Sequence, residues 1–289
     1  PGVALRFCDV SEIIADYSLS TNNPHISVET YYRFLIQKLL PFYDKVLYLD
    51  SDLVVNGDVA ELFSTELGDN LLAAVCDIDF AGNVNMKDGK RLKYAKNVLG
   101  MKQPFEYFQA GVLLLNTRAM RNLHPIEKWL ELASDDRYIY NDQDVLNACC
   151  EGRVTFLDYD WNVMIDCGNR INNVFAYAPA AMLDAFMDSR CHEKVVHYAG
   201  FEKPWKTSAC DRSELYWSYA RDTPFYEKLV AGMCGFIPRT AQDNFRPMPR
   251  HSISPDNTVV RGIFDPILPL GSKRREAAKS FLRAVRGLN

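Results

Sequence analysis

The sequence predicts an α/β fold built on a mostly parallel sheet that is flanked by helices. Short apolar runs of strand length alternate along the chain with longer stretches of helical periodicity. Several of these runs end directly at a polar residue, which is where open α/β sheets bind their ligands. The chain has 289 residues, of which 48% are hydrophobic, so it can bury a large core. We therefore expect one main domain with an appendage.

The first elements lead to a pair of carboxylates. Residues 3–8 roughly alternate between the two faces of a strand, and residues 28–40 carry apolar side chains at helical spacing. Residues 45–49 form a short, largely apolar run of the kind found in strands that are buried on both faces. That run leads directly into Asp50 and Asp52.

Later elements repeat this arrangement of an apolar run followed by a polar residue. The runs and the residues that follow them are 71–76 with Asp77, 111–115 with Asn116, and 195–196 with His197. Helical patterns cover 118–134 and 142–150 between them. The polar residues at these strand ends are potential ligands.

The net charge of −4 conceals an uneven distribution. Residues 273–289 carry six Lys or Arg and one Glu, a balance of +5, which leaves −9 on the first 272 residues. An acidic body makes general nucleic-acid binding an unfavourable expectation. The basic segment 273–289 patterns as an amphipathic helix, so we expect it to attach the protein peripherally to a membrane, with a solvated helix as the alternative.

The eight cysteines indicate a reducing compartment. They lack CxxC pairs and zinc-type spacing, and several lie in apolar runs, so we read them as reduced core residues of a cytoplasmic protein. The sequence has no apolar run near the roughly 18 residues that a spanning helix needs. From residue 207 the composition changes, and we expect a helical and irregular appendage over 207–289 after a main domain over 1–206.

Asp50, Asp52 and His197 are the candidate metal ligands. Two carboxylates separated by one residue at a strand end can both reach one divalent cation, although Asp-x-Asp alone is common in turns. A lone His is more often a core residue, but Gly200 and Lys203 follow it, and these residue types suit a phosphate. The mixed oxygen and nitrogen set favours Mn²⁺, with Mg²⁺ as the second choice.

Five segments, in this order, resemble the motif set of glycosyltransferase family eight, the retaining enzymes with a GT-A fold that include bacterial lipopolysaccharide galactosyltransferases and glucosyltransferases. They are His25-Ile-Ser-Val-Glu-Thr-Tyr-Tyr-Arg33, Val46-Leu-Tyr-Leu-Asp-Ser-Asp52, Phe108-Gln-Ala-Gly-Val-Leu-Leu114, Asn141-Asp-Gln-Asp144 and His197-Tyr-Ala-Gly-Phe-Glu-Lys-Pro-Trp205. The resemblance runs from about residue 3 to 206. It implies transfer of a glucose or galactose unit from a UDP-hexose to a saccharide or glycolipid acceptor.

The resemblance also implies roles for individual residues, which are Asp50, Asp52 and His197 as Mn²⁺ ligands, Gly200 and Lys203 at the donor diphosphate, Arg33 at donor sugar and phosphate, Asp77, Asp142, Gln143 and Gln109 around the donor sugar, and His25 on the acceptor side. Two departures from the family stand out. The chain opens at what resembles the second strand of the family, so the first strand, which holds the nucleotide base, is expected to be missing. Gln109 stands where the family usually has Asn, which puts its contact with the donor sugar in doubt.

An amide such as Gln143 is a poor nucleophile, so we favour a front-face reaction in which Gln143 and Asp142 stabilise positive charge on the sugar. Two alternative functions stay open. In an aspartyl-phosphate phosphohydrolase, Asp50 would be the nucleophile and Asp52 the acid and base. In an inactive binding protein, the fold would persist without chemistry.

Overall fold

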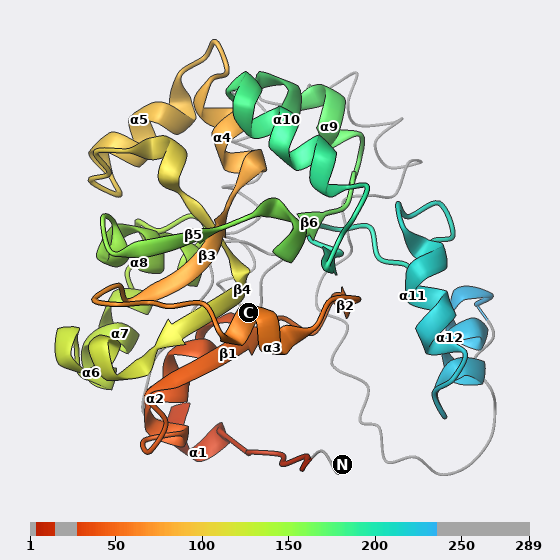
Figure 1. Cartoon of the computed structure of the whole chain (residues 1–289), viewed down its shortest axis with the longest axis horizontal. Helices are drawn as coiled ribbons and strands as arrows, with labels where there is room; N and C mark the ends of the chain where they lie inside the picture. The colour runs from red at the N-terminus through yellow and green to blue at the C-terminus, as the bar shows by residue number, and fades with distance from the viewer. Residues whose placement is uncertain (1–3, 15–27, 236–289) are drawn as a thin grey trace, which may run out of the picture. The chain divides into compact units, whose positions relative to one another are not determined.

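The computed structural model describes residues 4–14 and 28–235 (Figure 1). The chain divides into two compact units, Pro1–Ile237 and Pro238–Asn289, and all described residues belong to the first. The strands are β1 (Lys45–Leu49), β2 (Leu53–Val55), β3 (Leu72–Cys76), β4 (Phe108–Asn116), β5 (Val154–Leu157), β6 (Val163–Met164) and β7 (Val195–His197). The α-helices are α1 (Ser11–Ile14), α2 (Ile36–Leu39), α3 (Val59–Phe63), α4 (Ile78–Val84), α5 (Lys90–Asn97), α6 (Thr117–Leu123), α7 (Ile126–Ala133), α8 (Asn141–Cys150), α9 (Arg170–Asn173), α10 (Ala180–Ser189), α11 (Ser213–Ala220) and α12 (Tyr226–Met233). Four 3₁₀ helices complete the elements: η1 (Val28–Leu35), η2 (Pro104–Glu106), η3 (Tyr159–Trp161) and η4 (Phe175–Tyr177).

The main sheet has four strands in the order β1-β4-β3-β5. Strand β4 runs antiparallel to both β1 and β3, whereas β3 and β5 are parallel. The α/β class is as expected, but the strand directions are mixed rather than mostly parallel. Apolar runs report burial and carry no information on direction, which is why the sequence pattern missed the reversal of β4.

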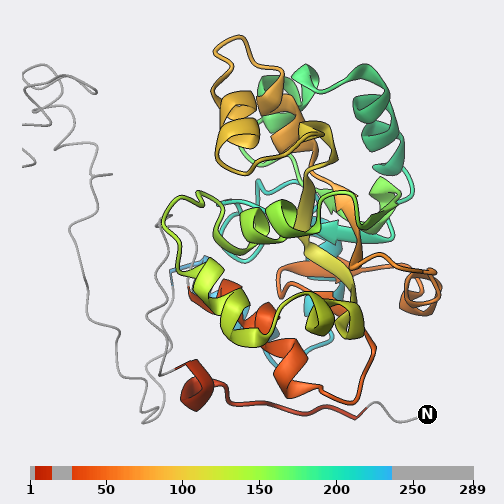
Figure 2. The same ribbon diagram turned by 90° about the vertical axis from the view of Figure 1, so that its left-hand side faces the viewer.

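Strand β4 is buried on both faces and holds the core together. Its side chains alternate, so that Leu113 and Leu115 enter one apolar cluster while Val112 enters another. The first cluster packs η1, α7 and α8 against the sheet, and the second packs α4, α10 and the strands around His197. Figure 2 shows helices on both sides of the strands. Burial on two faces is the arrangement that an α/β fold requires.

A second, three-stranded sheet, β2-β7-β6, adjoins the end of β1. Strand β2 runs antiparallel to β7, so Leu53 lies opposite His197. The amide of Tyr198 donates to the carbonyl of Asp52 at 3.0 Å, which continues this pairing up to the acidic residues. The pairing of β2 with β7 therefore joins two stretches that lie 140–144 residues apart in the sequence.

Other segments depart from the sequence pattern. The strand expected over 3–8 is wrong, because residues 4–8 form no strand and are exposed. The helix expected over 28–40 is a 3₁₀ helix followed by the short α2, and the one over 118–134 is two helices broken before Pro125. Among the described residues, β1 has a partner strand on one side, β4.

The cysteines and the C-terminal region were only partly anticipated. All eight cysteines are free, but Cys8, Cys191 and Cys234 are exposed rather than in the core. No helix within 4–14 and 28–235 is both long and apolar enough to cross a membrane. The helices α11 and α12 follow residue 207, whereas the basic segment 273–289 lies outside the described residues. The domain boundary after residue 206 stays a prediction.

Candidate metal centre

Asp50, Asp52 and His197 meet at the junction of the two sheets. One ligand atom from each lies within 4.8 Å of the other two. The Nε2 atom of His197 is 3.4 Å from Oδ1 of Asp52 and 3.9 Å from Oδ2 of Asp50. The imidazole is nearly buried, while both carboxylates retain about a quarter of their side-chain exposure, at 25% and 23%. A single cation can bridge these atoms and remain open to a ligand from solvent.

The backbone of Gly111 forms the floor of this centre. Its carbonyl accepts a hydrogen bond from the amide of Asp50 at 2.8 Å, which fixes the end of β1 on β4. A Cβ atom at this position would lie 2.3 Å from Cε1 of His197 and 2.9 Å from Oδ2 of Asp50. Contacts this close are sterically forbidden, so only glycine allows the carboxylate and the imidazole to converge over the strand.

Arg33 holds one side of the centre from η1. It is only 7% exposed, and its Nη2 and Nε atoms pair with Asp50 at 3.1 Å and with Asp142 at 2.9 Å. Its Nη1 donates to the carbonyl of Ala110. Tyr48 lies on β1, two residues before Asp50; it donates its hydroxyl to Asp50 at 2.6 Å and lies under the Arg33 guanidinium. Burial raises the pKa of Asp142, and the charge of Arg33 opposes that rise.

Lys203 closes the opposite side. Its ammonium donates to Oδ2 of Asp52 at 2.5 Å and to the carbonyl of Tyr198 at 2.5 Å. Burial alone would raise the pKa of Asp52, but hydrogen bonds and charges from His197 and Lys203 outweigh it and hold that pKa well below its ordinary value. The carboxylate is thus kept ionised, as a metal ligand must be.

Gly200 supports the same loop. Its φ of 114° lies in a region that favours glycine, and an added Cβ would lie 2.8 Å from Sγ of Cys167. The loop that carries Lys203 is therefore packed tightly against the segment around Cys167.

Gln143, which follows Asp142 on α8, is hydrogen-bonded to Asp77 at the end of β3. The Oε1 atom of Gln143 accepts from the amide of Ala110 at 2.9 Å, and its Nε2 atom donates to Oδ2 of Asp77 at 2.9 Å. The other oxygen of Asp77 caps α4 by accepting from the amide of Phe80 at 2.9 Å. Burial, reinforced by the charge of Asp79, raises the pKa of Asp77 to about 6.

Gln109 is turned toward its own strand. Its Oε1 accepts from the amide of Gly111 at 2.5 Å and from Nδ2 of Asn162 at 2.8 Å. Asn162 in turn lies 2.9 Å from Nδ1 of His197.

Thus the structure brings together ten of the eleven residues selected from the sequence, around β4 and its neighbours. The exception, His25, lies outside the described residues. Sequence reasoning missed Gly111, Tyr48 and Asn162. A lone Gly inside an apolar strand signals close backbone approach and could have identified Gly111. Tyr48 could have been noted from its i,i+2 spacing to Asp50, whereas no pattern marks Asn162.

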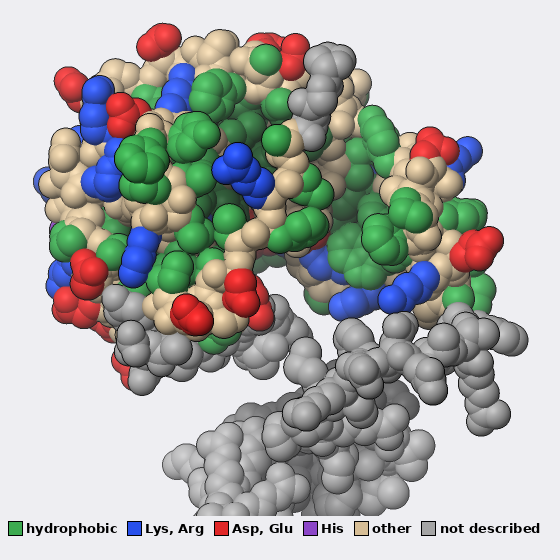
Figure 3. Space-filling view, turned by 90° about the horizontal axis from the view of Figure 1, so that it is seen from below, with side chains coloured by type: hydrophobic (Ala, Val, Ile, Leu, Met, Phe, Trp, Pro, Cys, Tyr) green, Lys and Arg blue, Asp and Glu red, His purple; other side chains and the backbone are tan. Residues whose placement is uncertain are grey.

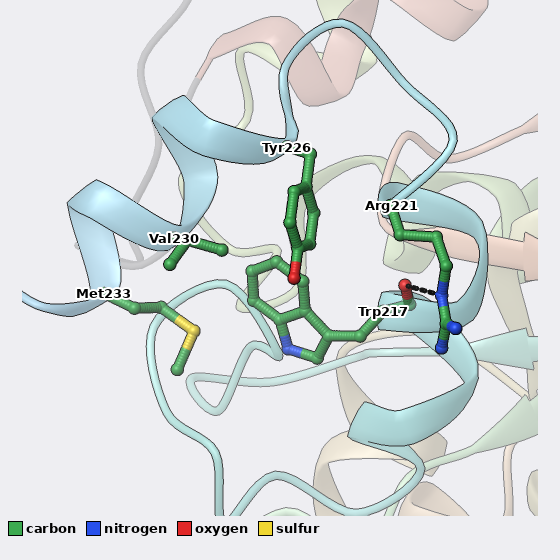
Figure 4. Close-up of a pocket in the computed structure, with 5 residues that line it drawn as sticks. All are labelled: Trp217, Arg221, Tyr226, Val230 and Met233. Carbon is green, nitrogen blue, oxygen red and sulfur yellow. Dashed lines mark hydrogen bonds between the residues drawn. The ribbon is translucent and has the colours of Figure 1, made fainter.

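A separate hollow of about 320 Å³ lies between α11 and α12, lined by Trp217, Arg221, Tyr226, Val230 and Met233 (Figure 4). The rings of Trp217 and Tyr226 meet edge to face, with centroids 6.1 Å apart. On the face shown in Figure 3, exposed hydrophobic side chains of this region lie beside Lys and Arg. Trp217 donates its indole NH to the carbonyl of Pro204 at 3.2 Å, but the metal-centre residues do not line the hollow.

Comparison with known proteins agrees with this architecture. The WbbM bifunctional glycosyltransferase is 34% identical with a TM-score of 0.71, over 81% of this chain and 42% of that one. The galactosyltransferase LgtC, solved with donor and acceptor sugar analogues, is 28% identical with a TM-score of 0.54, over 81% of this chain and 75% of its own. The fold is therefore the GT-A fold of these glycosyltransferases.

A family model described as glycosyl transferase family 8 matches residues 5–209, and the chain belongs to this family. Glycosyltransferase GlyF of Streptococcus pneumoniae serotype 4 is 30% identical over 207 residues, 71% of this chain and 44% of GlyF. The lipopolysaccharide 1,2-glucosyltransferase of Escherichia coli is 28% identical over 193 residues, 66% of this chain and 53% of that enzyme. The chain thus spans about half the length of these relatives.

Proposed function

We propose that this chain is a retaining, metal-dependent hexosyltransferase that moves glucose or galactose from a UDP-sugar to a hydroxyl of a saccharide or glycolipid. The observation that carries the proposal is the convergence of Asp50, Asp52 and His197 within 4.8 Å, in a member of family 8. Family membership also argues against the phosphohydrolase alternative.

The ligand set fits Mn²⁺. Two carboxylates and an imidazole form a mixed oxygen and nitrogen set that suits Mn²⁺ somewhat better than Mg²⁺. The floor at Gly111 supports this fit, since it leaves space for the ligand atoms to approach one another. A bound divalent cation would neutralise the negative charge that develops on a diphosphate leaving group.

The chain's own residues would bind and orient the donor. Lys203, already within reach of Asp52, supplies a point charge to a diphosphate, and Gly200 lets the backbone approach it. Arg33 ties the metal ligand Asp50 to Asp142, so the phosphate side and the sugar side of the site are held at a fixed separation.

The hydrogen bonds of Gln143 favour the front-face route. Its carbonyl oxygen already accepts from Ala110, and both oxygens of Asp142 are engaged, one by Thr30 and one by Arg33. Groups held in this way are poor nucleophiles but suitable dipoles for stabilising a positively charged sugar. We propose that the departing phosphate accepts the proton of the acceptor hydroxyl while Gln143 and Asp142 face the developing charge, with Asp77 fixing Gln143.

Incubation with Mn²⁺, a panel of UDP-hexoses and a saccharide acceptor, with UDP release as the readout, tests this function. We expect release with one donor, and loss of release in Asp52→Asn or after chelation. Hydrolysis of p-nitrophenyl phosphate without UDP release would support the phosphohydrolase, and absence of both reactions would support an inactive binding protein.

We also propose a cytoplasmic location at the inner face of the membrane, through the basic segment 273–289. Six basic residues near an anionic surface, at about 1 kcal/mol each, suffice for peripheral attachment. Binding to anionic liposomes should fall sharply when 273–289 is deleted. Unchanged binding would remove this proposal without affecting the transferase.

A further inference from the structure

The second nitrogen of His197 begins a chain of hydrogen bonds that ends at the backbone of β4. Nδ1 of His197 lies 2.9 Å from Oδ1 of Asn162, and Nδ2 of Asn162 donates to Oε1 of Gln109 at 2.8 Å. The amide of Gly111 donates to the same Oε1 at 2.5 Å. His197 ends β7, Asn162 precedes β6, and the other two lie on β4, so the chain connects three strands.

The direction of every hydrogen bond in this chain follows from one group whose polarity cannot change. The backbone N–H of Gly111 is always a donor, so Gln109 must present its oxygen to it. Asn162 must then direct its NH₂ group to that oxygen and its own oxygen to the imidazole. His197 therefore carries its proton on Nδ1, which leaves the lone pair of Nε2 directed at the carboxylates.

The Nε2–H tautomer of His197 would be favoured by the nearby carboxylate of Asp52, but the hydrogen bonds through Asn162 and Gln109 oppose it. A proton on Nε2 would face Oδ1 of Asp52 at 3.4 Å and would occupy the position of the metal. Adopting it would turn the Asn162 and Gln109 amides around and would bring an NH₂ group against the N–H of Gly111. A donor left without an acceptor in a buried site is strongly disfavoured.

We propose that Asn162 and Gln109 are positioning residues that fix His197 as the Nδ1–H tautomer before any metal binds. This deepens the proposed function, and it rests on that function only for the identity of the ligand at Nε2. It also gives Gln109 a role other than the contact with the donor sugar expected from its place in the motif. The longer side chain folds back onto its own strand, where its oxygen takes both hydrogen bonds.

The test is long-range ¹H–¹⁵N correlation spectroscopy of the metal-free full chain labelled with ¹⁵N-histidine. The chain has five histidines, and the spectrum of His197→Gln assigns the one of interest. At pH 8.5 we expect the Nδ1–H pattern in the unaltered protein. An Nε2–H pattern there overturns the proposal.

Two variants separate positioning from stability. Asn162→Asp keeps an oxygen facing Nδ1 and should retain the tautomer, whereas Asn162→Leu should lose it and bind Mn²⁺ about 10- to 100-fold more weakly. Asn70→Leu is the matched control, because the side chain of Asn70 donates a partly buried hydrogen bond to Thr155, away from the metal centre. It should lower stability while leaving tautomer and Mn²⁺ affinity unchanged.

If Asn162→Leu does not fold, Gln109→Met breaks the same chain one step further from the ring and should shift the tautomer in the same direction. An unchanged tautomer and unchanged Mn²⁺ affinity in a folded Asn162→Leu or Gln109→Met variant overturn the proposal. The spectrum needs neither a UDP-sugar nor turnover. If the protein shows the expected tautomer but releases no UDP, the proposed function is wrong and the proposal about the tautomer still stands.

Discussion

Replacing Gly111 by Ala should weaken metal binding more than it lowers the stability of the fold. The added Cβ would lie 2.3 Å from Cε1 of His197 and 2.9 Å from Oδ2 of Asp50. The ring must retreat by about 1.1 Å to reach an ordinary contact of 3.4 Å, and the carboxylate by about half as much. Overpacking of this kind costs about 1–3 kcal/mol, and in a unit of this size 1 kcal/mol lowers Tm by about 2–4 °C.

The loss of metal binding should exceed the loss of stability. Mn²⁺ at about a hundred times its Kd stabilises a folded protein by about 2.7 kcal/mol. A displaced imidazole that weakens affinity at least tenfold reduces this to about 1.4 kcal/mol. Thermal unfolding of Gly111→Ala with and without Mn²⁺ should thus show a metal-dependent rise in Tm of half the original or less.

A control in a helix isolates the effect of position. Gly232 in α12 has no atom within 4 Å of a built Cβ, so Gly232→Ala should leave the Mn²⁺-dependent rise unchanged. Its stability should stay equal or increase by up to about 1 kcal/mol. A Gly111→Ala protein that keeps the full Mn²⁺-dependent rise would refute the steric reasoning.

Three further predictions concern the neighbours of the centre. Arg33→Met removes the cation from the buried carboxylate of Asp142 and the partly exposed one of Asp50, and it should lower the free energy of unfolding by about 3–5 kcal/mol in urea titrations. The double variant with Asp142→Asn should recover part of this loss, and a loss below about 1 kcal/mol would contradict the pairing. Because the pKa of Asp77 is raised to about 6, the folded chain keeps a proton that the unfolded chain has lost, so the stability contributed by this group should fall as pH rises from about 4 to 6. The unfolding free energy of the unaltered chain minus that of Asp77→Asn should therefore fall as the pH rises over that window. A rise of this quantity would contradict a raised pKa at Asp77. Gly200→Ala, with φ at 114° and Cys167 in contact, should lower Tm by several degrees in calorimetry and weaken UDP binding, and unchanged values for both would argue against a tightly packed loop.

The sequence was most informative where residue type and element end coincide. Asp50, Asp52 and His197 could be selected because ligand-type side chains follow apolar runs, and the ordered motifs connected them. Their close approach in space depends on the pairing of β2 with β7, which the pattern of apolar residues does not specify. The geometry of the centre therefore had to come from the structure.

Other features lack a local signal altogether. The alternation over 3–8 describes a two-faced segment, but it becomes a strand only beside a partner, and in the structure Leu5 and Phe7 are 77% and 91% exposed. Asn162 acts through His197, which is distant in sequence, so nothing near it in the chain reveals its partner. Gly111 could have been inferred as a lone Gly within an apolar strand, and Tyr48 from its spacing to Asp50.

The double use of β4 has a consequence for how new specificities can arise. Its backbone serves Arg33, Asp50 and Gln143 while its side chains fill the core on both faces. A substitution in β4 disturbs the core as well as the site, so we expect few substitutions in this strand to be tolerated. If the proposed transfer is correct, we expect variation in sugar or acceptor preference to arise in peripheral turns such as the one at Phe201, whose side chain is 68% exposed.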